Sequence, residues 1–326
     1  MKRAFVFPGQ GSQTVGMGKA LAAADPVARA IFEEVDDALG EKLSSLMFDG
    51  DPETLNLTRN AQPALMAVSV AATRVLLEKL QRPAHQAASF VAGHSLGEYS
   101  AFVAAGCLSV GDAARLLRLR GDAMQRAVPV GEGAMAAVLG LDMEAVEAIA
   151  AEAGKAGAGH AEAGQADDLV CQVANDNAPG QIVVSGHKGA IERAIDLAAA
   201  RGAKRSMLLP VSAPFHCSLM APAARVMADA LAQIDLGAPL VPVVPNMTAT
   251  AVTDPPELRR LLVEQITGRV RWRESVIHMR SAGVDQFVEL GAGKVLSGLS
   301  RRIDKGASAL SLGTLEDIEA FVATTV

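Results

Sequence analysis

The sequence predicts an α/β fold in which a large domain with a mostly parallel sheet carries a small ferredoxin-like α+β domain as an insertion. Three observations predict this fold. At 326 residues the chain exceeds the usual size of a single core. Short apolar strands alternate with helical patterns at both ends, which is typical of a parallel sheet covered by helices. Between these ends the order becomes strand-helix-strand-strand-helix-strand, the ferredoxin-like order. We therefore expect a large domain over 1–128 and 209–326 and an inserted domain over 129–208.

The large domain is predicted from short apolar runs that end at glycine and from longer amphipathic segments between them. Before the insertion we expect a strand at Ala4–Phe7, helices over 15–23, 26–39 and 61–80, a strand over 87–92, and helices over 96–105 and 111–127. After the insertion we expect a helix at Ala221–Ile234, a strand at Val241–Asn246, helices at Glu257–Ile266 and Trp272–Ser281, and a strand at Asp285–Leu290.

The inserted domain is predicted from a change in the sequence pattern, in which the apolar runs become shorter and turn-forming residues become more frequent. We expect strands at Ala134–Leu139, Leu169–Ala174, Gln181–Ser185 and Ser206–Pro210, helices at Met143–Ala153 and Gly189–Arg201, a loose loop at Gly154–Gln165, and a turn at Asn175–Gly180.

Composition and motif spacing exclude several classes of function. The net charge of −6 disfavours nucleic-acid binding, and no apolar run approaches the roughly 18 residues that span a membrane. Three cysteines, an odd number without metal-like spacing, predict a reducing, cytoplasmic location and no metal site. Gly291–Lys294 lacks the earlier glycine of a phosphate loop, and Gly9-x-Gly11 lacks the third glycine of a dinucleotide fingerprint. We therefore expect no cofactor.

The segment Gly93-His94-Ser95-Leu96-Gly97 follows an apolar strand and precedes a helix. This Gly-x-Ser-x-Gly pattern is typical of a nucleophile elbow, in which a sharp turn exposes the serine hydroxyl at the top of an α/β-hydrolase sheet. We therefore expect an α/β-hydrolase-like large domain with Ser95 as a nucleophile. The alternative is an ordinary strand-to-helix turn in which Ser95 caps the helix.

A serine nucleophile needs a base, and the chain has six histidines. His94 adjoins Ser95, but neighbouring side chains at a sharp turn point apart. His216 follows a predicted strand and a proline-bearing loop, and loops at the carboxyl edge of a sheet carry such partners. Elimination of the others favours His216 as the base; the alternative is a hydrogen-bonded structural histidine.

Four motifs together resemble the malonyl-CoA:acyl carrier protein transacylases and the similar acyltransferase domains of polyketide and fatty-acid synthases. They are Gly9-Gln10-Gly11-Ser12-Gln13, Gly93–Glu98, Arg120 within Leu119-Arg120-Gly121, and Phe215-His216. The motifs stand in the family's order, and the resemblance runs from residue 5 to about 300, which is nearly the whole chain.

The resemblance implies roles for individual residues. Ser95 would carry the acyl group, with His216 as its general base and acid. The backbone N–H groups of Gln10 and Leu96 would form the oxyanion hole, and Gly9 and Gly11 would let the loop backbone of Gln10 approach the elbow.

The resemblance also implies how the acyl group and the histidine are held. Arg120 would bind the malonyl carboxylate, since a guanidinium matches a carboxylate with two hydrogen bonds. The backbone carbonyl of Gln265 would orient His216 in place of the usual carboxylate. Phe215 would restrict α-substituted acyl groups, or it could simply pack in the core.

The resemblance predicts an enzyme that transfers a malonyl group from malonyl-CoA, through a malonyl-serine ester, to the phosphopantetheine thiol of acyl carrier protein in fatty-acid synthesis. We expect a monomer without nucleic-acid or membrane partners. Acyl carrier proteins are usually acidic, so docking would need a local basic patch, for which the candidates are Lys204, Arg205, Arg301 and Arg302. Alternatives are the transacylase component of a malonate decarboxylase, a serine esterase or thioesterase, and a non-catalytic binding subunit.

Overall fold

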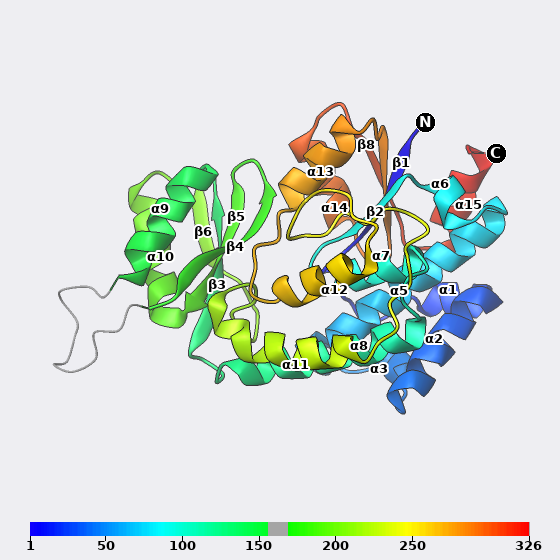
Figure 1. Ribbon diagram of the computed structural model, residues 1–326, viewed down its shortest axis with the longest axis horizontal. Helices are drawn as coiled ribbons and strands as arrows, with labels where there is room; N and C mark the ends of the chain where they lie inside the picture. Colours follow the sequence, from blue (N-terminus) through cyan, green and yellow to red (C-terminus); the bar gives the residue numbers. More distant parts are fainter. Residues whose placement is uncertain (156–168, 326) are drawn as a thin grey trace.

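A computed structural model describes residues 1–155 and 169–325, and its elements form two regions (Figure 1). Beyond Lys155, the predicted loop Gly154–Gln165 lies outside the described residues. None of the described helices is long and apolar enough to cross a membrane.

A parallel sheet forms the centre of the larger region. Its strands are β1 (Arg3–Phe7), β2 (Phe90–Gly93), β7 (Gln286–Leu290) and β8 (Ser308–Leu312). Their order is β2-β1-β7-β8, and every neighbouring pair is parallel. Strands β1, β2 and β7 are buried over nearly their whole length, as expected for strands covered on both faces.

The register of this sheet positions two loops beside each other. Phe7, the last residue of β1, pairs with Gly93, the last residue of β2. Because the carboxyl ends of parallel strands meet at one edge, the loops that begin at Pro8 and His94 leave the sheet side by side.

Helices cover this sheet, and one of them is buried all round over residues 60–73. Helix α5 is buried over most of its length and packs against α2, α7, α8 and α15. The helices of this region are α1 (Lys19–Ala24), α2 (Pro26–Leu39), α3 (Leu43–Asp49), α4 (Pro52–Asn56), α5 (Thr58–Leu80), α6 (Ala84–Ala87), α7 (Gly97–Ala104), α8 (Val110–Ala127), the 3₁₀ turn η1 (Ser218–Met220), α11 (Ala221–Ala232), α12 (Pro255–Glu264), α13 (Trp272–Ser281), α14 (Val295–Ile303) and α15 (Leu315–Ala323).

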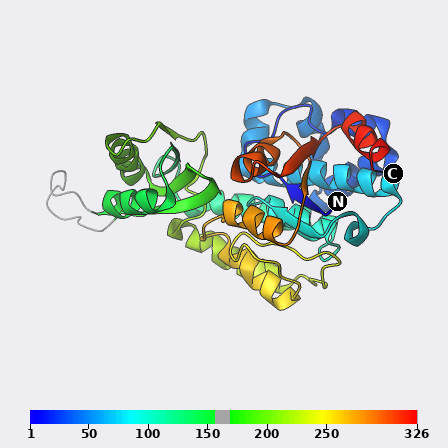
Figure 2. The same cartoon turned by 90° about the horizontal axis from the view of Figure 1, so that it is seen from above.

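The second region is built on an antiparallel sheet. Its strands β3 (Gly133–Leu139), β4 (Cys171–Ala178), β5 (Gln181–His187) and β6 (Arg205–Leu208) lie in the order β4-β5-β3-β6. Helices α9 (Met143–Gly154) and α10 (Lys188–Ala200) pack on it around a separate apolar core. This region, drawn in green, lies to one side of the parallel sheet in both views (Figures 1 and 2).

The fold-class prediction is confirmed, because a parallel sheet and a separate small antiparallel sheet are both present. The chain order β3-α9-β4-β5-α10-β6 is the predicted ferredoxin-like order. The domain boundaries near residues 128 and 208 stay a prediction.

Two of the expected segments are wrong, and the strand β8 and the helices α14 and α15 were not expected. The predicted turn at Asn175–Gly180 is wrong, because Asn175–Ala178 continue β4 and the turn comprises Pro179 and Gly180. The polar residues there face partners from the larger region: Asp176 pairs with Arg273 at 2.8 Å. Tertiary contacts thus outweigh the turn propensity of the sequence Asn-Asp-Asn.

The predicted strand Val241–Asn246 is also wrong. Only Val243 makes ladder contacts, as isolated bridges to Val91 and Val252. Pro242 and Pro245 have no N–H groups, so the segment cannot complete a ladder.

Gly121 on α8 tests the close packing of α8 on α5. A Cβ at this position would lie 2.5 Å from the Cα of Arg59 and 2.8 Å from the carbonyl oxygen of Thr58. We expect Gly121→Ala to lower the free energy of unfolding in urea, although alanine is favoured in a helix by about 1 kcal/mol.

The matched control is Gly298→Ala in α14, where a Cβ would meet nothing within 4 Å. This variant should be as stable as the wild type or more so. Equal gains in both variants would contradict the close packing of α8 on α5.

Candidate active site

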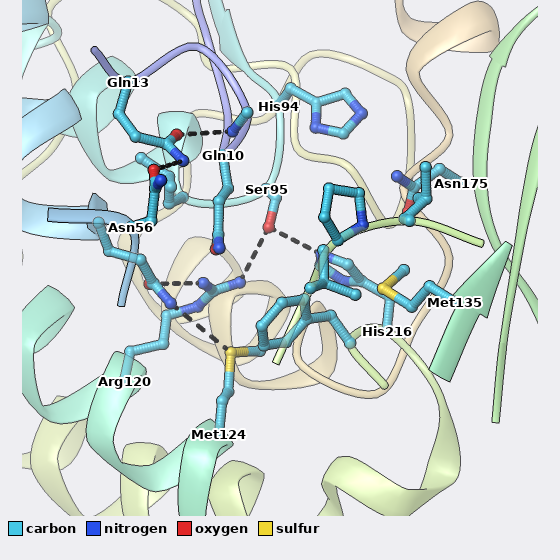
Figure 3. A pocket seen from close by; sticks show the side chains of 17 residues that line it. Gln10, Gln13, Asn56, His94, Ser95, Arg120, Met124, Met135, Asn175 and His216 are labelled. Atoms are coloured by element: carbon cyan, nitrogen blue, oxygen red, sulfur yellow. Dashed lines mark hydrogen bonds between the residues drawn. The ribbon is translucent and has the colours of Figure 1, made fainter. Parts of the chain in front are cut away.

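A pocket opens where the loops after β1 and β2 face α8 and the small sheet (Figure 3). Both polar and apolar side chains line it. The lining residues include Gln10, Gln62, Ser95, Arg120 and His216 among the polar ones, and Met124, Met135, Leu209, Val211 and Phe215 among the apolar ones.

Ser95 occupies a sharp turn between β2 and α7. Its φ of 52° lies in the left-handed region, which a non-glycine residue adopts at a cost of about 1–3 kcal/mol. A Cβ on Gly93 would lie 1.9 Å from the backbone of Gly97, and a Cβ on Gly97 would lie 2.3 Å from the carbonyl oxygen of Phe7. Both glycines are therefore required by the close approach of strand and helix. The predicted elbow geometry is present.

His216 contacts the Ser95 hydroxyl from the loop after β6. Its Nε2 lies 2.7 Å from Ser95 Oγ, and its Nδ1 lies 2.9 Å from the carbonyl oxygen of Gln265. A carbonyl oxygen only accepts, so Nδ1 carries the proton and Nε2 is left to accept from the serine. The Ser95 hydroxyl therefore makes this bond instead of capping the helix, and α7 has no side-chain cap.

Burial strongly affects the charge of His216. The side chain is buried, and desolvation together with the nearby Arg120 charge lowers its pKa to about 3. His216 is thus neutral at physiological pH. His94, by contrast, is directed away from Ser95 (Figure 3). Its Nε2 lies 2.8 Å from Asn177 Oδ1.

Arg120 is a buried cation without an anionic partner. It is 1% exposed, and no acidic side chain among the described residues lies within salt-bridge distance of it. Its guanidinium donates to Gln62 Oε1 at 2.7 Å, to Gln265 Oε1 at 2.8 Å and to Ser95 Oγ at 3.2 Å. An unpaired buried charge is unfavourable, so the site favours an anion beside Ser95.

Two backbone amides border Ser95 without partners of their own. Within the described part of the chain, neither the Gln10 nor the Leu96 N–H donates a hydrogen bond to another group. Gly9 lies close to the elbow, since a Cβ there would be 2.8 Å from the carbonyl oxygen of His94. These amides are available to an oxygen that develops negative charge at the pocket wall.

Comparison with known proteins places this geometry in a family. A sequence profile described as "Acyl transferase domain" matches residues 4–322, which is nearly the whole chain. The chain belongs to the acyl transferase domain family.

Individual relatives are similar over their full lengths. A Bacillus subtilis (strain 168) protein named malonyl CoA-acyl carrier protein transacylase is 45% identical over 323 residues, covering 99% of this chain and 97% of that protein. A crystal structure of an acyl-carrier-protein-S-malonyltransferase from Bartonella henselae has a TM-score of 0.92 and 53% identity, covering 99% of both chains. A type II PKS acyl-carrier protein in complex with its malonyl-transacylase has a TM-score of 0.92 and 42% identity, covering 99% of this chain and 100% of that chain.

Within this acyl transferase fold, the structure brings together Ser95, His216, Arg120, Gln10, Leu96 and Gln265, all of which the sequence analysis singled out. Phe215 lines the same pocket. Among the described residues there is no cluster of three or more histidine, cysteine or acidic side chains that would hold a metal.

The predicted docking residues lie outside the pocket. Arg205 is exposed at the end of β6 away from the lining residue Leu209, about 13 Å along the strand. Lys204 is exposed beside Gly140, Arg301 donates to the carbonyl oxygen of Ala309, and Arg302 donates to Gln181 Oε1 at 3.2 Å. They form no part of the acyl transferase pocket wall.

Sequence reasoning missed three side chains that hold the site. Gln62 binds Arg120, and Asn246 accepts from the Ser95 N–H at 2.8 Å. Glu98 in turn accepts from the Asn246 N–H at 2.9 Å. The available signal was a polar residue within an apolar stretch, since Gln62 and Asn246 each interrupt or end such a run.

The low pKa of His216 predicts a pH-dependent stability. An unfolded histidine titrates near 6.5, whereas His216 stays neutral in the folded chain down to about 3. Between these values the unfolded chain binds the extra proton, so this contribution is complete above about pH 6.5 and is lost as the pH falls. We expect His216→Gln to flatten the acid loss of stability by up to about 1.4 kcal/mol per pH unit.

Urea unfolding at pH 7, 6 and 5 measures this difference. The control is His85→Gln, since His85 is exposed on α6 and should leave the wild-type slope in place. Identical slopes for His216→Gln and the wild type would contradict a buried neutral His216.

Proposed function

We propose that this protein transfers a malonyl group from malonyl-CoA to the phosphopantetheine thiol of acyl carrier protein, through a malonyl ester on Ser95, and so supplies fatty-acid synthesis. The observation that carries the proposal is the buried Arg120 guanidinium, which lies 3.2 Å from Ser95 Oγ and has no acidic side chain of the described residues within salt-bridge distance. The names of the relatives and the carrier-protein complex support the same substrates.

In the first half-reaction, Ser95 Oγ attacks the thioester carbonyl carbon as His216 Nε2 accepts the hydroxyl proton. The carbonyl oxygen becomes an oxyanion and accepts hydrogen bonds from the N–H groups of Gln10 and Leu96. Collapse of this intermediate breaks the carbon–sulfur bond, and His216 returns the proton to the departing coenzyme A sulfur.

In the second half-reaction, His216 accepts the proton of the carrier thiol, and the sulfur attacks the ester carbonyl carbon. The carbon–oxygen bond to Ser95 breaks, and His216 protonates the serine oxygen. The apolar lining around Met124, Met135 and Phe215 disfavours water as the competing nucleophile.

Arg120 links acyl recognition to this proton transfer. Its charge lowers the pKa of His216, and a malonyl carboxylate beside the guanidinium offsets that charge. A bound malonyl group therefore makes His216 a stronger base than an acetyl group does. Recognition and activation then share one residue.

We also propose that the protein acts in the cytoplasm as a monomer without nucleic-acid or membrane partners. Its three cysteines are buried and unpaired, in keeping with a reducing compartment. Lys204, Arg205, Arg301 and Arg302 remain the proposed docking residues. A carrier protein inserts only its pantetheine arm, so these residues need not line the pocket.

Intact-mass spectrometry after mixing with malonyl-CoA tests the nucleophile. The wild type should gain one malonyl group, and Ser95→Ala should gain none because the attacking oxygen is missing. An adduct that survives in Ser95→Ala would contradict the role of Ser95.

The intact-mass result, together with assays of malonate release and of transfer to each carrier, separates the alternative functions. Steady release of free malonate without a carrier would indicate an esterase, and absence of any wild-type adduct would indicate a binding subunit. Transfer to the carrier of a malonate decarboxylase, but not to acyl carrier protein, would indicate that complex instead.

Arg120→Ala tests the carboxylate site. We expect acylation by malonyl-CoA to fall by about 100-fold or more relative to acylation by acetyl-CoA, because only malonyl pairs with the guanidinium. Rapid-quench mass spectrometry with both thioesters measures the ratio. Arg126→Ala, an exposed position on the same helix, should leave the ratio unchanged. Equal losses for both thioesters in Arg120→Ala would contradict the carboxylate role.

A further inference from the structure

Glu98 is a buried acidic residue that the reaction described above does not use. It lies in the first turn of α7, three residues after Ser95, and is fully buried. No lysine, arginine or histidine among the described residues lies within salt-bridge distance of it. Burying a carboxyl group without a cation is unfavourable, so its contacts need a separate explanation.

Only one of its two oxygens is engaged. Oε2 accepts from the backbone N–H of Asn246 at 2.9 Å and from Gln265 Nε2 at 3.0 Å, whereas Oε1 has no partner among the described residues. Asn246 and Gln265 come from distant parts of the chain, and Glu98 joins them directly behind the elbow.

Both partners hold the backbone of Ser95. Asn246 Oδ1 accepts from the Ser95 N–H at 2.8 Å, and its Nδ2 donates to the carbonyl oxygen of Gly93 at 2.6 Å. Gln265 Nε2 donates to the carbonyl oxygen of Ser95 at 3.0 Å. The two peptide groups that flank the strained Ser95 Cα are thus held by the side chains of Asn246 and Gln265. Both residues donate to Glu98 Oε2, Asn246 through its backbone N–H and Gln265 through its side-chain amide.

Gln265 extends this control to the other reacting groups. Its backbone carbonyl accepts from His216 Nδ1, and its side-chain oxygen accepts from Arg120. Because the Gln265 amide donates to Glu98, its oxygen is turned toward the guanidinium. Through Asn246 and Gln265, the single oxygen Glu98 Oε2 therefore constrains the positions of Ser95, His216 and Arg120.

We infer that Glu98 is a positioning residue, whose single oxygen Oε2 holds Asn246 and Gln265 so that Ser95 Oγ stays aligned with His216 Nε2. The inference rests on the proposed function only in taking Ser95 as the nucleophile. Reach is the essential property, because the oxygen must be where both donors meet. The negative charge is secondary, because it acts on Arg120 only from beyond salt-bridge distance and Oε1 has no hydrogen-bond partner among the described residues.

Two conservative substitutions separate reach from charge. Glu98→Asp keeps the carboxyl group but withdraws its oxygens by one methylene. Glu98→Gln keeps an oxygen at the position of Oε2 and puts the amide nitrogen at the position of Oε1, which accepts no hydrogen bond from the described residues. We expect Glu98→Asp to slow the reaction of Ser95 by about 100-fold, the effect of a displacement near 1 Å, and Glu98→Gln to react close to the wild-type rate.

The probe is phenylmethylsulfonyl fluoride, which reports on the serine and histidine without an acyl substrate. Ser95 Oγ bonds to sulfur, fluoride leaves, and His216 takes the hydroxyl proton. The labelling rate is followed by intact mass, with thermal unfolding measured in parallel. A wild type that is labelled but takes no malonyl from malonyl-CoA would overturn the proposed function and leave the Glu98 comparison intact.

The matched control is Glu289→Asp. Glu289 is fully buried on β7 and likewise accepts two hydrogen bonds, from the N–H groups of Leu296 and Ser297, but it has no hydrogen bond to the elbow. Its variant should lose stability and keep the wild-type labelling rate per folded molecule.

Three results would overturn the inference: wild-type labelling in folded Glu98→Asp, slow labelling in Glu98→Gln, or equally slow labelling in Glu289→Asp. If Glu98→Asp does not fold, the rate of Glu98→Gln decides, since loss of the charge alone should then be harmless.

Discussion

The turn at Ser95 requires that β1, β2 and the start of α7 lie in direct contact. Gly93 and Gly97 permit this contact, because a methyl group at either position would overlap neighbouring backbone atoms. The same contact brings the loop of Gln10 beside the serine. The left-handed conformation of Ser95, the free amides and the exposed hydroxyl are therefore consequences of one packing constraint in the parallel sheet.

The electrostatics of the pocket depend equally on the lack of a carboxylate of the described residues beside Arg120 and His216. Arg120 is surrounded by amide oxygens and a hydroxyl, which orient its guanidinium without neutralising it. His216 is held by the neutral carbonyl of Gln265 and not by a carboxylate, so this contact favours the charged imidazole less than a carboxylate would. The pocket is thus electrostatically incomplete until an anionic acyl group enters it.

Sequence alone predicted the features that depend on local backbone chemistry. The spacing of Gly93, Ser95 and Gly97 predicted the elbow because glycine has few other reasons to appear at those positions. The sequence alone could not predict the roles of residues that act through contacts with distant parts of the chain. Asn175–Ala178 has the composition of a turn yet forms a strand against the larger region. Glu98 looks like an ordinary acidic residue in a first helical turn, and its partners lie 148 and 167 residues away.

The guanidinium of Arg120 also affects the folding stability of the empty protein relative to the acylated one. A ligand that binds the folded chain but not the unfolded one stabilises the fold, and an anion at Arg120 does so by supplying the missing charge. Under the proposed function, a malonyl ester on Ser95 holds such an anion in place covalently. The acylated protein would then resist unfolding better than the empty one.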